Sequence, residues 1–313
     1  MSLAFLFPGQ GSQSLGMMAP FESLPAVRPT FDEASAALGF DLWALVDNGP
    51  EEELGKTVNT QPIMLTAGIA LYRAWKDLGG PDPAVVAGHS LGEYTALVAA
   101  GVLDFAQTVP LVRFRAQAMQ EAVPEGTGAM AAILGLDEAA LSGVCADAAS
   151  AGVAEPANFN SPGQVVIAGE AAGVRRAMEL AKERGAKRAV LLPMSAPSHC
   201  SLMLPAAERL QKLLDAATIR SPSIPVINNV DVAAEQTPER IRDALMRQLS
   251  NPVRWSQIVT AMAARGVGLM VECGPGGVLA GLNKRIVPEV KTVALRDGEG
   301  LRELALQSRS ESS

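Results

Sequence analysis

The sequence predicts an α/β fold in which a small domain is inserted into a large one. Short apolar runs alternate with helix-like stretches over most of the chain. This alternation is typical of a parallel sheet covered by helices on both faces. Between about residues 125 and 194 the rhythm changes, and strand-like runs follow one another more closely. We therefore expect residues 1–124 and 195–313 to form the large domain and residues 125–194 to form the insertion.

The large domain is expected to contain a parallel sheet of short, buried strands. Each predicted strand is an apolar run bounded by turn residues. These runs are Leu3–Phe7, Ala84–Ala87, Ile224–Asn228, Gly268–Glu272 and Lys291–Leu295.

The insertion follows the order strand, helix, strand, strand, helix, strand. We expect these elements at Ala129–Leu136, Glu138–Ala149, Val153–Phe159, Gln164–Ala168, Ala172–Arg184 and Arg188–Leu192. This βαββαβ order is that of a ferredoxin-like unit. The crevice between an insertion and its parent domain is a natural ligand site.

Composition excludes several classes of protein. The net charge of −7 argues against nucleic-acid binding, which needs a concentrated positive face. The apolar run Leu3–Phe7 is too short to span a membrane and follows no basic segment, so we expect no membrane association and a cytoplasmic location. Cys145, Cys200 and Cys273 lack the spacing of metal ligands, so we predict reduced thiols and no metal site.

Ser90 is the candidate nucleophile. It lies in Gly88-His89-Ser90-Leu91-Gly92, directly after an apolar run and before an alanine-rich, helix-like segment. A Gly-x-Ser-x-Gly pattern between a strand and a helix is typical of a nucleophile elbow. The pattern alone is weak in a chain with 29 glycines, but its flanks strengthen it. We therefore expect an α/β-hydrolase-like large domain with Ser90 on its sheet edge.

A serine hydroxyl needs a general base, and the chain has only two histidines. His89 precedes Ser90 directly, and adjacent side chains diverge in a sharp elbow, so we expect it to brace the turn. His199 lies where the insertion returns to the large domain. An isolated histidine is more often a structural, hydrogen-bonded residue, but beside a credible elbow we predict that His199 is the base.

Two backbone N–H groups are expected to stabilise the oxyanion. One belongs to the residue after the nucleophile, Leu91. For the second we predict Gln10, in the loop Pro8–Gln13 that follows the first strand and reaches the same sheet edge. An ordinary glycine turn is the alternative, and a phosphate loop is disfavoured because its Gly-Lys-Ser/Thr ending is missing.

Arg115 lies on an otherwise apolar row of a predicted helix. At helical spacing it shares a face with Leu111, Ala118 and Ala122, so its guanidinium is expected to point inward. A buried arginine needs a negative partner. That partner is either an internal carboxylate or a carboxylate of the substrate.

Taken together, several motifs resemble the malonyl-CoA:acyl carrier protein transacylases of fatty acid synthesis, almost from end to end. They are Phe7–Gln13, Gly88–Tyr94, Arg115, Asn158–Gln164 and Pro197–His199. The resemblance implies that Ser90 carries the acyl group, that His199 is the base and that Arg115 holds the malonyl carboxylate. It also implies Gln10 and Leu91 as oxyanion donors.

In this family a main-chain carbonyl, rather than an acidic residue, orients the histidine. The resemblance implies that Gln248 is the residue that supplies this carbonyl. The inserted ferredoxin-like domain is also a feature of the family.

The resemblance implies malonyl-CoA as substrate and acyl carrier protein as partner, with no permanently bound cofactor. The carrier is acidic, so this acidic chain needs a local basic surface. Lys187-Arg188 and Lys284-Arg285 are candidates, although such pairs are usually solvated surface.

Two alternatives share these features. A serine thioesterase or esterase of the α/β-hydrolase type has the elbow but releases its product to water. A noncatalytic subunit of the same fold would only dock carrier or synthase proteins, which the intact serine, histidine and arginine disfavour. The sequence leaves open a fatty acid or polyketide carrier, the tolerance of methylmalonyl groups and the oligomeric state, although a freestanding module favours fatty acid synthesis.

Overall fold

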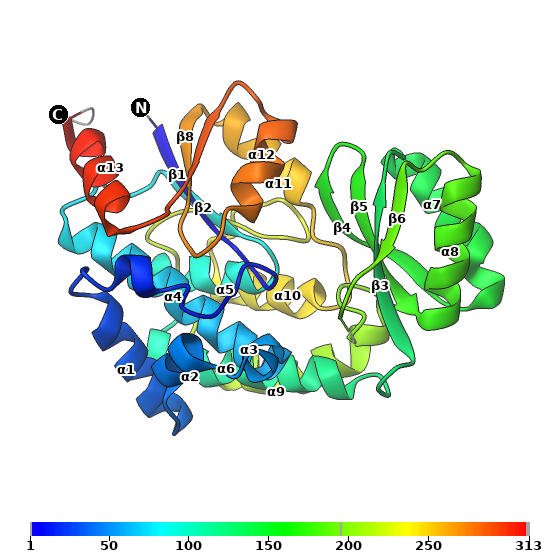
Figure 1. Cartoon of the computed structure of the whole chain (residues 1–313), viewed down its shortest axis with the longest axis horizontal. Coiled ribbons are helices and arrows are strands. Elements are labelled where there is room, and N and C mark those ends of the chain that lie inside the picture. The colour runs from blue at the N-terminus through cyan, green and yellow to red at the C-terminus, as the bar shows by residue number, and fades with distance from the viewer. Residues whose placement is uncertain (1, 195, 311–313) are drawn as a thin grey trace.

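Two separate sheets organise the chain, which is described by a computed structural model over residues 2–194 and 196–310. The large sheet has the order β7-β2-β1-β8-β9, and the small sheet has the order β4-β5-β3-β6 (Figure 1). The predicted boundary at Ser195 and the predicted chain limits Met1 and Ser313 lie outside the described residues.

The large sheet confirms the predicted parallel strands. They are β1 Ser2–Phe7, β2 Val85–Gly88, β7 Val226–Ile227, β8 Val267–Glu272 and β9 Lys291–Ala294. All four pairings between them are parallel. The strand β7 is shorter than expected, because it lies at the edge of the sheet and pairs with β2 over only two residues.

Helices cover both faces of this sheet (Figure 1). Those of the large part are α1 Val27–Leu38, α2 Leu42–Asn48, α3 Glu51–Gly55, α4 Thr57–Asp77, α5 Leu91–Ala99, α6 Phe105–Glu121, α9 Leu204–Ala216, α10 Pro238–Gln248, α11 Trp255–Ala264, α12 Val278–Ile286 and α13 Gly298–Ser310. Single 3₁₀ turns are formed by η1 Ala19–Phe21, η2 Ala149–Ala151 and η3 Ser201–Met203.

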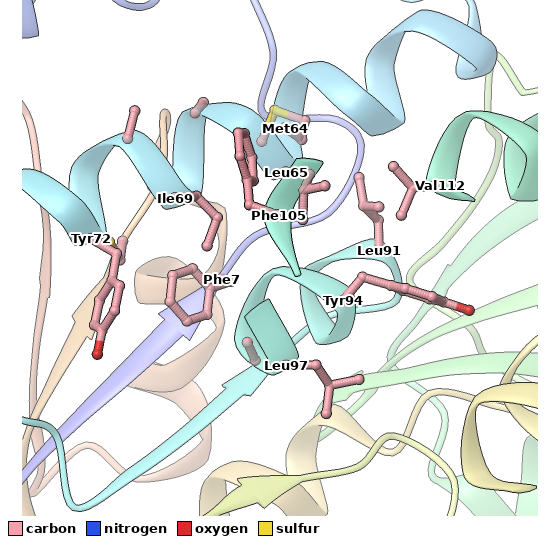
Figure 2. Packing of buried hydrophobic residues seen from close by; sticks show 14 of the residues in the cluster. Phe7, Met64, Leu65, Ile69, Tyr72, Leu91, Tyr94, Leu97, Phe105 and Val112 are labelled. Carbon is pink, nitrogen blue, oxygen red and sulfur yellow. The ribbon is translucent and has the colours of Figure 1, made fainter. Parts of the chain in front are cut away.

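Alternating side chains of β1 supply two cores, as expected for a strand buried on both faces. Phe5 and Phe7 join the apolar cluster of α4, α5 and α6, whereas Ala4 and Leu6 join that of α11 and α12. Figure 2 shows the first cluster, in which Phe7 lies between Ile69 and Tyr72 of α4 and Leu97 of α5. This packing fixes α4, α5 and α6 around the end of β2.

The small sheet is antiparallel throughout. Its strands are β3 Gly128–Leu134, β4 Ala154–Ser161, β5 Gln164–Glu170 and β6 Arg188–Leu191. The helices α7 Glu138–Ala148 and α8 Ala171–Glu183 pack on one face, at the side away from the parallel sheet (Figure 1).

The strand β4 joins the small sheet to the large part. Val253 donates its N–H to the carbonyl of Ala157 at 2.9 Å, and Phe159 donates to the carbonyl of Val253 at 2.9 Å. The Glu155 carboxylate accepts the N–H and the hydroxyl of Ser201 at 2.7 and 2.8 Å, two residues after His199. The small sheet is therefore tied to the segment that carries the predicted base.

None of the helices within residues 2–194 and 196–310 has the length and apolar character needed to cross a bilayer.

Candidate active site

Ser90 stands on a sharp turn between β2 and α5. Its backbone has φ 53° and ψ −108°, an uncommon conformation for a residue with a side chain. Gly92 permits the turn because a Cβ there would lie 2.0 Å from the carbonyl oxygen of Phe7. A Cβ at Gly88 would lie 1.9 Å from the backbone of Gly92. These close approaches explain why the motif needs both glycines, and they give Ser90 the predicted elbow geometry.

Two amide side chains hold the backbone of the elbow. The Oδ1 of Asn229 accepts the N–H of Ser90 at 2.7 Å, and its Nδ2 donates to the carbonyl of Gly88 at 2.7 Å. The Nε2 of Gln248 donates to the carbonyl of Ser90 at 3.0 Å. Sequence reasoning missed Asn229, although its place just after β7 puts it at the same sheet edge as the elbow.

His199 reaches Ser90 from the segment after the small sheet. Its Nε2 lies 2.7 Å from Ser90 Oγ, and its Nδ1 lies 2.8 Å from the main-chain oxygen of Gln248. A carbonyl oxygen only accepts, so Nδ1 carries the proton in the neutral ring and Nε2 presents a lone pair to the hydroxyl. Ser90, His199 and Gln248 are thus brought together.

Burial, followed by the nearby Arg115 charge, lowers the pKa of His199 to about 3. The imidazole is therefore neutral near pH 7 and able to accept a proton. His199 has φ +64°, and the N–H of His199 donates to the carbonyl of Leu249 at 3.0 Å. This bond and the Nδ1 contact fix the ring direction.

His89, which we expected to brace the turn, makes its side-chain contacts with Asn160 and Trp255. Its Nε2 lies 2.8 Å from Oδ1 of Asn160, and its ring packs against Trp255 with centroids 5.6 Å apart. Burial lowers the pKa of His89, so the ring is neutral. Asn160 belongs to β4, so His89 links the elbow to the small sheet.

Arg115 points inward, as the apolar row on its helix predicted, and is only 1% exposed. Its Nη1 donates to Oε1 of Gln61 at 2.8 Å, and its Nη2 donates to Oε1 of Gln248 at 2.9 Å and to Oγ of Ser90 at 3.2 Å. The guanidinium also lies 5.4 Å from the ring centre of Tyr94. Of the two partners left open by the sequence, an internal carboxylate does not touch it directly among the described residues.

A carboxylate, that of Glu93, is linked to Arg115 through the side chain of Gln248. Oε2 of Glu93 accepts Nε2 of the same Gln248 at 2.8 Å. Sequence reasoning missed both Glu93 and Gln61. Glu93 had a signal, a charged residue inside an apolar helical stretch, as at Arg115. Gln61 had none of this kind, because it follows the polar residues Asn59 and Thr60.

Gln10 and Leu91 border the same cavity as Ser90 and His199. Leu91 is the first residue of α5, and Oε1 of Gln10 accepts the Thr57 hydroxyl at 2.6 Å. The parallel pairing of Phe7 with Gly88 brings the Gln10 loop beside the elbow, as expected from the shared sheet edge.

The cavity has a volume of about 180 Å³ and lies between the two sheets. Its remaining walls are mainly apolar and come from the small sheet, the segment after it and the helices α6 and α12. They include Met119, Met130, Val166, Leu192, Met194, Val278, Leu279 and Leu282. Within residues 2–194 and 196–310, no three His, Cys, Asp or Glu side chains gather to hold a metal ion.

The two basic pairs lie around the β4–β5 hairpin. Nη1 of Arg285, on α12, donates to Oε1 of Gln164 at 2.9 Å. Gln164 pairs with Leu134 on the next strand, and Leu134 pairs with Arg188. Lys187, Arg188, Lys284 and Arg285 are all exposed.

Comparisons with a family model, with curated proteins and with solved structures all point to the same family. A family model described as "Acyl transferase domain" matches residues 4–295. The malonyl CoA-acyl carrier protein transacylase of Escherichia coli K12 is 59% identical over 295 residues, which cover 94% of this chain and 96% of that protein.

Solved structures that are similar to this chain belong to the same kind of enzyme. An acyl carrier protein S-malonyltransferase from Vibrio cholerae is 56% identical, with a TM-score of 0.95 over 97% of this chain and 100% of that one. A malonyl-transacylase solved with a type II PKS acyl-carrier protein is 53% identical, with a TM-score of 0.96 over 98% and 99% of the two chains. With matches of this identity over almost its whole length, the chain belongs to the acyl transferase family, among the malonyl CoA-acyl carrier protein transacylases.

Proposed function

We propose that this chain transfers the malonyl group of malonyl-CoA to the phosphopantetheine thiol of acyl carrier protein through an ester on Ser90. The observation that carries the proposal is the convergence of an imidazole and a guanidinium on the hydroxyl oxygen of Ser90. Nε2 of His199 lies 2.7 Å and Nη2 of Arg115 lies 3.2 Å from Ser90 Oγ. The names of the close relatives support the same reaction.

In the first half-reaction, Ser90 Oγ attacks the thioester carbonyl carbon while Nε2 of His199 takes the hydroxyl proton. The C–S bond then breaks, and the departing CoA sulfur receives that proton. The Gln248 carbonyl stabilises the transient imidazolium through Nδ1, in the place where other serine enzymes use a carboxylate. A malonyl-serine ester remains.

In the second half-reaction the carrier thiol enters the same cavity. It gives its proton to Nε2 of His199 and attacks the ester carbonyl, and Ser90 leaves with the proton returned. The backbone N–H groups of Gln10 and Leu91 are our candidates for binding the oxyanion in both steps. Their position on the cavity wall beside Ser90 supports that role.

Arg115 is our candidate for holding the malonyl carboxylate by two parallel hydrogen bonds. Its contacts in this structure are neutral amide and hydroxyl oxygens, which an incoming carboxylate can outcompete. The carboxylate and the reacting carbonyl of a malonyl group are separated by one methylene. The short distance between Arg115 and Ser90 suits that separation.

For the architecture, we propose an α/β-hydrolase-like large domain over residues 1–124 and 195–313 and a ferredoxin-like insertion over residues 125–194. The antiparallel order β4-β5-β3-β6, with α7 and α8 on one face, supports the second assignment. The elbow at the end of β2 supports the first. Cytoplasmic residence stays a prediction from the sequence.

For the carrier, we propose docking at the basic surface formed by Lys187, Arg188, Lys284 and Arg285. Its support is the Arg285–Gln164 contact, which brings α12 to the β4–β5 hairpin. The same helix contributes Val278 and Leu282 to the cavity wall, so a carrier bound there would be near the site. A relative solved with its acyl-carrier protein supports the class of partner.

The experiment is intact-protein mass spectrometry after mixing the protein with malonyl-CoA. We expect the mass of one malonyl group on the wild type and none on Ser90→Ala. Addition of holo carrier should remove the label and produce malonyl carrier. Free malonate formed equally with and without carrier would instead favour a thioesterase.

A polyketide carrier remains the second candidate, because one relative was solved with a type II PKS carrier. Parallel transfer assays with both kinds of carrier decide between them.

A further inference from the structure

Glu93 is a buried carboxylate to which the proposed reaction gives no task. It lies on α5, three residues after Ser90, and is 2% exposed. Its Oε2 accepts two N–H groups, Nε2 of Gln248 at 2.8 Å and the backbone N–H of Asn229 at 3.0 Å. The side chains of Gln248 and Asn229 also hold the elbow. A buried carboxylate is costly and needs a compensating charge.

That charge is the Arg115 guanidinium, reached through one amide. Gln248 donates to Glu93 and accepts from Nη2 of Arg115 at 2.9 Å. The carboxylate therefore balances the buried arginine without occupying the side of the guanidinium that faces Ser90. A direct ion pair would block that side against an incoming acyl carboxylate.

Acylation by a malonyl group changes the charge balance of this site. Before acylation there is one guanidinium and one carboxylate, and afterwards there are two carboxylates. Two carboxylates sharing one buried cation raise the pKa of the less well paired one. The acyl carboxylate would contact the guanidinium directly, whereas Glu93 is separated from it by Gln248.

A small cavity gives Glu93 room to exchange a proton. It has a volume of about 10 Å³, enough for one water, and is lined by Glu93, Asn228 and Glu235 among apolar neighbours. Nδ2 of Asn228 is buried and, among the described residues, has no hydrogen-bond partner. Buried donors are commonly satisfied by an ordered water, and this cavity has room for one.

The groups facing Glu93 are few. Arg115 favours its ionised form, Asp231 opposes it, and the Asp231 carboxylate is itself paired with Arg247. Among the described residues, Tyr94 and Glu235 are the other titratable neighbours. The ring of His199, which lies near Arg115, is neutral. Burial raises the pKa of Glu93 to about 7, so a second nearby anion shifts it through the neutral range.

We propose that Glu93 takes up a proton from solvent when a malonyl group, but not a neutral acyl group, is bound at Ser90. Glu93 is then a specificity-determining residue that keeps the buried site electrically balanced. This inference rests on the proposed function, and its test separates the two.

The test measures proton uptake with a pH indicator in weak buffer near pH 8, during stoichiometric acylation. Proton uptake is divided by the amount of CoA released. Both donors release the same CoA thiol, so any proton that this thiol loses cancels in the comparison. We expect malonyl-CoA to give an excess over acetyl-CoA on the order of one proton per acylated serine. Glu93→Gln should abolish the excess, because its Oε1 can accept the same two N–H groups without carrying charge. Glu235→Gln, at the same cavity, should retain it.

An absent excess in the wild type, or an excess retained by Glu93→Gln, overturns the inference. If Glu93→Gln does not fold, the wild type is measured near pH 5.5, where Glu93 is already protonated. Persistence of the full excess there also overturns it. Mass spectrometry of the same samples reports malonylation of Ser90 independently. Malonylation without the excess refutes only this inference, whereas absent malonylation refutes the proposed function.

Discussion

The Nη2 of Arg115 donates to the Oγ of Ser90 across 3.2 Å, although Arg115 lies on α6 and Ser90 on the turn before α5, 25 positions apart. The guanidinium thus lies beside the Ser90 hydroxyl. A cation so placed favours acyl groups that carry a negative charge close to the reacting carbon. After burial, it is also the second cause that lowers the pKa of His199. In the reaction proposed above, the same residue therefore acts on both substrate choice and proton transfer.

Replacing Arg115 by alanine should remove selectivity for malonyl groups. Loss of the bidentate contact is expected to cost about 2 to 4 kcal/mol of transition-state binding for malonyl-CoA. Acetyl transfer should be little changed or improved. The measurement is kcat/KM for Ser90 acylation by each donor.

Arg113→Ala is the matched control for that variant. Arg113 lies two residues earlier on α6, with its guanidinium 4.8 Å from the ring centre of Phe40, away from Ser90. It should retain the wild-type ratio of malonyl to acetyl transfer. An unchanged ratio of malonyl to acetyl transfer in Arg115→Ala would contradict the proposal that Arg115 holds the malonyl carboxylate.

Gly92→Ala should destabilise the elbow. Its Cβ would lie 2.0 Å from the carbonyl oxygen of Phe7, so β1 or α5 must move. We expect a loss of about 1 to 3 kcal/mol or more in the free energy of unfolding, measured by urea denaturation, together with a fall in acylation rate. Gly281→Ala, in the interior of α12 with open space around it, should instead be neutral or stabilising by about 0.5 to 1 kcal/mol. Equal effects of the two substitutions would contradict the steric argument.

The sequence predicted the parallel strands, and the succession of strands and helices between residues 128 and 191, because such elements carry a local apolar signal. It also predicted Ser90, whose glycine neighbours are required by local sterics. The inward direction of Arg115 followed from helical spacing, but its partners did not. Gln61 and Gln248 meet Arg115 only after α4, α6 and α10 pack together, and no local pattern specifies that packing.

The same reasoning explains the missed Asn229 and Glu93. Each contacts residues more than a hundred positions away in the chain, and no local pattern of the sequence specifies those contacts. Gln248 was predicted only from the family resemblance. Its contact with His199 uses a main-chain oxygen, and the spacing of side chains carries no signal for such a contact.

Protonation of His199 should make the folded protein less stable in acid. Burial lowers its folded pKa from 6.5 to about 3, so the unfolded chain binds this proton more readily. The stability that depends on a neutral ring is fully present above about pH 6.5 and is lost as the pH falls toward 3. We expect the unfolding free energy of the wild type to fall by about 1.4 kcal/mol per pH unit relative to His199→Asn across this window. Urea denaturation at several pH values checks this, and parallel curves for the two proteins would contradict it.

Reversing the charge of Lys284 and Arg285 should weaken use of the carrier. Both side chains are exposed at the end of α12, beside the β4–β5 hairpin. Electrostatic attraction mainly accelerates encounter, so Lys284→Glu with Arg285→Glu should raise the KM for the carrier about tenfold at low salt and less at high salt. Lys212→Glu reverses one charge on α9, which lies on the other side of the molecule in Figure 1, and should leave the KM unchanged. The transfer half-reaction is measured from pre-formed malonyl-enzyme, so any effect on CoA binding is excluded. If the KM for the carrier stays at the wild-type value in the double variant, the carrier does not dock at Lys284 and Arg285.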